Sequence, residues 1–67
     1  MRMIVAVSAP GLPPTPPFGG LEGHLVEVGQ VDDTVEAGVV ALEKVQAEWD
    51  LPTPVMKVTG FRLKSRN

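Results

Sequence analysis

The proline-rich segment of residues 10–20 limits how this chain can fold more than any other feature. Its sequence, PGLPPTPPFGG, holds five of the seven prolines and three of the seven glycines. Proline fixes φ and lacks the N–H that a helix or a sheet ladder needs, so neither element can cross this segment. The sequence therefore predicts a semi-stiff arm with polyproline II character over residues 8–23. Leu12 and Phe18 are the large apolar side chains of residues 10–20, and we expect them to anchor the arm on a neighbouring subunit.

Chain length and composition limit the stability that one core can supply. The chain has 67 residues, of which 43% are hydrophobic, with no cysteine and a single histidine. A chain of this size buries only about 60% of its unfolded surface, and small domains often rely on disulfides or metals that this sequence does not offer. We therefore expect a single mini-domain over residues 1–67 that gains further stability from partners or from self-assembly.

Two segments have the patterns of β-strands. Residues 2–7, RMIVAV, are apolar at every position after the arginine, which is typical of a strand covered on both faces. We expect this strand to lie in the centre of a sheet. Residues 24–29, HLVEVG, alternate imperfectly between two faces, and they predict a second strand.

A third strand is predicted near the end of the chain, over residues 55–64. The segment VMKVTGFRLK alternates, but the phase of the alternation changes at Gly60. A β-bulge at Thr59–Gly60 would restore a single apolar face, because a bulge adds one residue to one strand of a pair. The opposite face would then carry three basic residues, which are Lys57, Arg62 and Lys64.

A helix is predicted from about Thr34 to about Asp50. Asp33 is the expected N-cap, and Glu36 completes an aspartate version of the capping box. The prolines after Leu51 end the helix. One arc of the helical wheel collects the residues expected to be buried, which are Val35, Gly38, Val39, Leu42, Val45 and Trp49. The glycine in this arc indicates a close approach of the helix to a strand.

Together, the predicted elements form an α+β mini-domain of order β-β-α-β, in which one amphipathic helix covers a small three-stranded sheet. Charge follows these elements. All eight acids lie within residues 22–50, whereas residues 51–67 hold four bases and no acid. Such divided charge steers partners, and we expect docking through the arm and the basic strand. The candidate interaction residues are Leu12, Phe18, Lys57, Arg62, Lys64 and Arg66.

No set of residues predicts catalysis, a cofactor or a metal site. His24 is the only histidine, and a metal site needs three or four converging ligands. Ser8 has no base arranged beside it in the sequence. We expect a protein that is not an enzyme and holds no cofactor. The apolar run of residues 3–7 is too short for a signal peptide or a membrane span, so a virion or cytoplasmic location is expected.

The sequence also contains features of two other kinds of binding. The arm contains three PxxP spacings, the form that SH3-like grooves bind, but no base lies between Ala9 and Gly23 to support that recognition. The basic end could contact phosphates, although four cations and one phenylalanine are few for a nucleic-acid surface. We expect protein partners, namely copies of this chain and a larger structural subunit, rather than nucleic acid or a membrane.

Residues 23–40, GHLVEVGQVDDTVEAGVV, together with VMKV at residues 55–58, resemble parts of biotinyl or lipoyl carrier domains. Those domains combine a valine and glycine run with a modified lysine in a hairpin. The resemblance covers a third of the chain and implies that Lys57 is the acceptor lysine. A carrier fragment is therefore one alternative function.

The short chain is rich in Gly, Pro and Val, with VEV at residues 26–28 and an Asp-Asp-capped helix that contains an Ala-Gly pair. In these features it resembles small head or tail accessory proteins of tailed phages. The resemblance implies a virion subunit whose arms lie on neighbours and which has no active site. The predicted function is a structural interaction subunit of a larger assembly, such as a capsid, decoration or head-tail protein. A small regulator that binds a host protein or nucleic acid is the other alternative.

Overall fold

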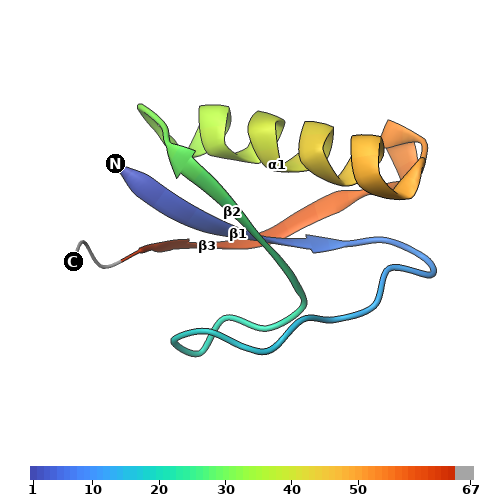
Figure 1. Ribbon diagram of the computed structural model, residues 1–67, viewed down its shortest axis with the longest axis horizontal. Helices are drawn as coiled ribbons and strands as arrows, with labels where there is room; N and C mark the ends of the chain where they lie inside the picture. Colours follow the sequence, from blue (N-terminus) through green and yellow to red (C-terminus); the bar gives the residue numbers. More distant parts are fainter. Residues whose placement is uncertain (65–67) are drawn as a thin grey trace.

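The computed structural model describes residues 1–64, and Figure 1 shows one helix lying along a three-stranded sheet. The elements in chain order are β1 (Arg2–Ser8), β2 (His24–Gln30), α1 (Thr34–Trp49), the 3₁₀ helix η1 (Thr53–Val55) and β3 (Lys57–Leu63). This architecture confirms the predicted α+β fold and its β-β-α-β order.

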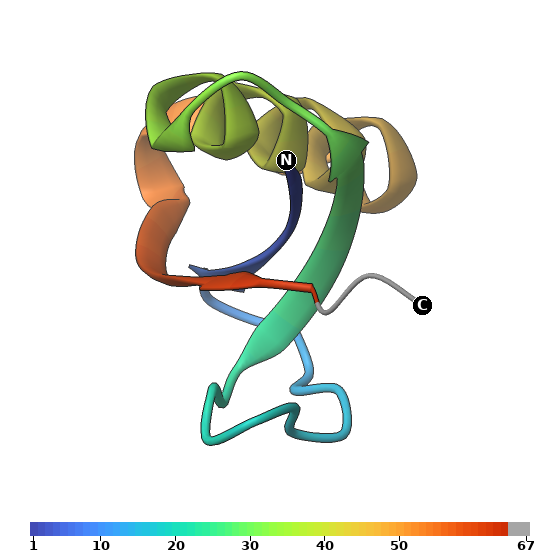
Figure 2. The same ribbon diagram turned by 90° about the vertical axis from the view of Figure 1, so that its left-hand side faces the viewer.

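The first strand, β1, lies at the centre of the sheet, as its continuous apolar pattern predicted. The strand order is β2-β1-β3, and both outer strands run antiparallel to β1. Residues 3–7 are all buried because both faces of β1 are covered. The helix packs on one face, and the end of the arm, near Leu21 and Gly23, approaches the other face. Figure 2 shows the helix and the arm on opposite sides of the sheet.

The last strand, β3, contains the predicted bulge. Its register against β1 shifts between Ala6 and Val7, so that Thr59 is the extra residue. Thr59 Oγ1 donates a hydrogen bond of 3.3 Å to the Ala6 carbonyl oxygen. The bulge leaves Val58 and Phe61 on the same side of the sheet, where both face the helix.

Local capping starts α1 where the sequence predicted. Asp33 has extended backbone angles, and its side chain accepts the Glu36 N–H over 2.8 Å. Glu36 in turn accepts the Asp32 N–H over 2.8 Å, a reciprocal pair close to the capping box. The helix ends at Trp49, just before the predicted end, because Asp50 takes a left-handed conformation with a φ of 55°.

The predicted buried stripe of α1 is only partly right. Val45 is buried, but Val35, Val39 and Trp49 are exposed. The buried face consists mostly of small residues, which are Ala37, Gly38, Ala41 and Val45. Small side chains let the helix lie close to the sheet, so the larger valines are displaced to its flank. The prediction drew the buried arc of the helical wheel through the larger apolar residues and therefore missed the two alanines.

The arm folds back on itself and does not project as an extended strap. The Thr15 N–H donates to the Gly23 carbonyl over 2.9 Å, and Phe18 and Leu21 exchange two backbone hydrogen bonds of 3.0 and 2.9 Å. Thr15 Oγ1 also accepts the Leu25 N–H over 2.9 Å, which ties the arm to β2. The arm is thus a closed loop on its own domain, and its anchoring on a neighbour stays a prediction.

Candidate protein-binding surface

Large apolar side chains remain exposed along the line where α1 meets β3. Val35 and Val39 of α1 are 74% and 52% exposed. Phe61 and Leu63 of β3 are 41% and 59% exposed. A Cβ placed on Gly38, in the same turn as the valines, would lie 3.9 Å from the Phe61 ring, so helix and strand meet here. We call Val35, Val39, Phe61 and Leu63 the α1–β3 strip.

The strip borders an open strand edge. β3 is an outer strand that pairs with β1 only, so within residues 1–64 its other edge has no strand beside it (Figure 1). An unpaired edge presents backbone donors and acceptors that a protein partner can use. Apolar side chains and unpaired backbone therefore occur together on this side of the molecule.

A shallow depression continues the strip along α1 toward η1. Its volume is about 310 Å³, and its lining residues are Val39, Leu42, Glu43, Gln46 and Thr53. The valine and the leucine form its apolar part. Glu43 lies beside them on the outer face of the helix, so this carboxylate marks an acidic border of the strip.

Basic side chains border the strip on the strand side. Val58 faces the helix, so the alternation of the strand directs Lys57 to the opposite face of the sheet. Arg62 is on that face too, beside Gly19, with its guanidinium carbon 6.0 Å from the centre of the Phe18 ring. The strip thus separates an acidic helix border from a basic strand border.

The residues predicted for interaction have different surroundings. Leu12 packs against the chain's own core, whereas Phe18 and Arg62 lie together as just described. Lys64 forms an ion pair with a glutamate of β2. Lys57 is exposed and enters no ion pair among residues 1–64. The remaining predicted residue, Arg66, lies outside the described residues.

Glu27 is the glutamate that pairs with Lys64, and it links β2 to β1 and to the residue that follows β3. The Lys64 ammonium donates a hydrogen bond to its carboxylate, and Arg2 of β1 is 3.8 Å away. This hydrogen bond and the positive charges of Lys64, Arg2 and Lys44 hold the pKa of Glu27 below its ordinary value of 4.5. Two of the basic side chains on this face are therefore already engaged within the molecule.

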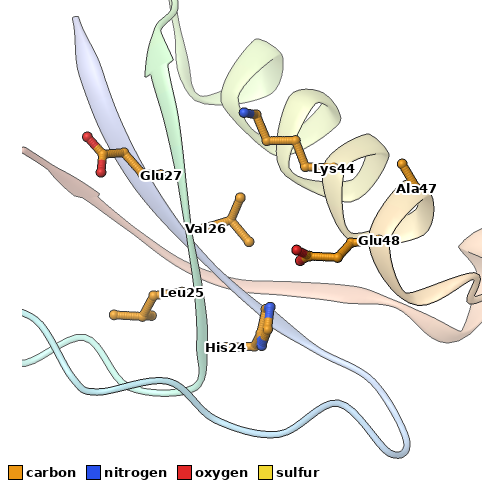
Figure 3. A pocket seen from close by; sticks show the side chains of 7 residues that line it. All are labelled: His24, Leu25, Val26, Glu27, Lys44, Ala47 and Glu48. Carbon is orange, nitrogen blue, oxygen red and sulfur yellow. The ribbon is translucent and has the colours of Figure 1, made fainter.

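A second depression lies on the opposite flank of α1, along the outer edge of β2. Its volume is about 530 Å³, and Figure 3 shows side chains of β2 and α1 around it. His24 borders this groove, and its Nδ1 donates to the Pro13 carbonyl over 2.8 Å. Its ring also meets the Trp49 ring edge-on, with 5.7 Å between centres. The lining residues are His24, Leu25, Val26, Glu27, Lys44, Ala47 and Glu48.

The groove beside β2 has mixed charge and shows no metal site. In residues 1–64, no group of three or more His, Cys, Asp or Glu side chains could hold a metal ion. The contacts of His24 with Pro13 and Trp49 fix the position of its ring. The sequence did not predict this groove, because its shape depends on the rotation of α1 over β2, which no local pattern specifies.

Lys57 has a position unlike that of a carrier lysine. It opens β3 directly after η1 and borders a depression of about 570 Å³ that also contacts Pro10, Pro54 and Val55. The carrier resemblance implies a lysine in a hairpin between two strands. The carrier alternative has no support in this geometry, and we do not propose it.

The fold and the strip define a small α+β protein that exposes apolar side chains along the edge where α1 meets β3. Comparison with known proteins gives no match: no protein-family model, curated protein or solved structure matches this chain. Among residues 1–64, no helix is both long enough and apolar enough to cross a membrane. The strip and its charged borders are therefore the features that bear on function.

Proposed function

We propose that this chain is a non-enzymatic interaction subunit that docks on protein partners through the α1–β3 strip. The observation that carries the proposal is the exposure of four large apolar side chains on one edge of a small domain. Contiguous apolar surface of this kind marks protein interfaces more often than an ordinary solvent face. Burial of Val35, Val39, Phe61 and Leu63 in a complex would supply stability that the small core lacks.

Protein fits this surface better than nucleic acid does. Phosphate binding needs several available cations. Lys64 and Arg2 already surround Glu27, and Arg62 lies over Phe18, which leaves Lys57 as the uncommitted base of β3. The apolar strip, in contrast, offers nothing to a phosphate. The regulator alternative is therefore retained only as binding to another protein.

The assembly that we propose for this subunit is a virion particle of a tailed phage. The support for this setting is the sequence resemblance to small head and tail accessory proteins. A subunit of such a particle would bury its strip against neighbouring proteins and would need no active site.

A photoreactive amino acid placed at position 39 tests the docking surface in the producing cell. We expect covalent adducts of defined mass from position 39, because Val39 lies in the strip and contacts the partner. The matched control is the same amino acid at position 47, since Ala47 is also an exposed residue of α1 but lies beside the β2 groove. No adduct from position 39, or equal adducts from both positions, would contradict the proposed function.

A further inference from the structure

The two charged borders of the strip restrict what can cover it. Glu43 lies beside Val39 on the helix side of the strip. On the strand side, Lys57 and Arg62 lie on the face of the sheet opposite the helix. A partner with matching charge must present cations to the helix and anions to the strand, with an apolar surface between them. A second copy of this chain has these three features in one surface.

We propose that two copies form a dimer in which the strip of each covers the strip of the other, around a two-fold axis that runs along the strip. Such an axis exchanges the helix side and the strand side. The α1 helix of one copy then faces the β3 strand of its partner, and the apolar side chains meet in the middle. This inference rests on the proposed function, since it names the partner of the same surface.

The direction of the elements brings opposite charges together along this axis. The N–H of Lys64 bonds to the Arg2 carbonyl and the N–H of Val31 to the Met1 carbonyl, so the start of α1 lies near the end of β3. A two-fold rotation about an axis along the strip does not change which end of α1 and which end of β3 lie at each end of that axis. The later part of α1, with Glu43, therefore meets the start of the partner's β3, with Lys57. The same contact occurs twice in the dimer.

A dimer that pairs the free edges of two β3 strands is disfavoured by the same charges. In that arrangement helix lies beside helix and strand beside strand. Lys57 and Arg62 of both copies would lie on one face of the joined sheet, and both Glu43 side chains would lie on the side of the helices. Like charges that lie opposite each other on adjacent strands are destabilising, whereas the crossed arrangement joins opposite charges, so charge favours the crossed dimer.

Charge exchange between two purified variants tests this dimer. Glu43→Lys alone places lysine against Lys57 of the partner, and Lys57→Glu alone places glutamate against Glu43. We expect each variant to lose the dimer at low salt, as measured by sedimentation velocity and by light scattering during gel filtration. Mixing the two variants should restore a dimer, because both contacts then join opposite charges.

The control and the other outcomes separate this inference from the proposed function. Lys44→Glu reverses a charge on the other flank of α1 and should dimerise like the unaltered chain. A mixture of the two variants that stays monomeric would overturn the crossed dimer. A mixture that forms assemblies of more than two copies would show open-ended contacts and would also overturn it. The unaltered chain could also be monomeric at every concentration while position 39 cross-links to a different protein in the cell. That result would overturn the dimer but would still agree with the proposed function.

Discussion

At the scale of single residues, Gly38 lies on the buried face of α1, although the structure leaves room there for a Cβ atom. A Cβ at this position would meet Val58 at 3.7 Å and the Phe61 ring at 3.9 Å, which are ordinary contact distances. Glycine inside a helix costs about 1 kcal/mol relative to alanine. The sequence correctly placed this glycine against a strand, but the approach is not close enough to exclude a methyl group.

We therefore expect Gly38→Ala to stabilise the protein by about 1 kcal/mol, measured as the free energy of unfolding in urea. Gly29→Ala is the matched control. Gly29 has open space around it but a φ of 75°, so a side chain there should cost about 1–2 kcal/mol through backbone strain alone. Destabilisation by Gly38→Ala would contradict the contact distances between α1 and β3.

Glu27 gives the protein a pH dependence with a defined sign. Its folded-state pKa lies below the ordinary value of 4.5, first because of the hydrogen bond from Lys64. A lowered pKa stabilises the fold above the ordinary value, and this contribution disappears as the pH falls below it toward the folded-state value. We expect unfolding curves to show lower stability in acid, and Glu27→Gln to reduce that dependence. An unchanged pH profile in Glu27→Gln would contradict the ion pair.

At the scale of elements, the boundaries could be predicted because their causes are local. Asp33 and Glu36 start the helix within one turn, and the change of phase at Gly60 marks the bulge. The rotation of α1 could not be predicted in this way, since it depends on how closely the helix lies to the sheet. The closure of the arm was missed for a related reason: the bond from Leu25 to Thr15 joins residues ten apart in the chain.

The close packing of α1 can be tested at Ala41, which is fully buried. Ala41→Leu should destabilise the protein by about 1–3 kcal/mol, because the larger side chain forces the helix away from the sheet. Val39→Leu is the control on the neighbouring exposed flank, and its stability should change by less than about 0.5 kcal/mol. If both variants unfolded at the same urea concentration, Ala41 would not be tightly packed against the sheet. The buried stripe of α1 would then lie where the sequence predicted it.

At the scale of the whole molecule, the sequence predicted the division of charge but not the apolar surface between the charges. Val35 and Val39 were assigned to the core by their place on one arc of the helical wheel, whereas the structure exposes both. The exposure of Phe61 and Leu63 follows from the position of β3 at an edge. Neither fact can be derived before the strands are placed in order. The candidate site therefore emerges only when the elements are assembled.

The double substitution Val35→Ser and Val39→Ser separates folding from association. Both side chains are exposed, so the unfolding free energy of the monomer should change by less than about 0.5 kcal/mol per site. Self-association, measured by light scattering, should be lost because the apolar centre of the interface is removed. Ala47→Ser, beside the β2 groove, is the control that should leave association intact. A double variant that still associates would place the interface elsewhere.

The hydrogen bond from Leu25 to Thr15 affects how readily copies of the protein could add to one another as strands of a fibre. In an antiparallel strand, each N–H points either toward its neighbour or away from it, and the Leu25 N–H points away from β1 to reach the arm. The arm thus occupies part of the outer edge of β2, where another strand would otherwise add. Fibre formation by repeated strand addition requires two receptive edges on each molecule. The proline-rich loop obstructs one of these edges at Leu25, so we expect it to hinder repeated strand addition along β2.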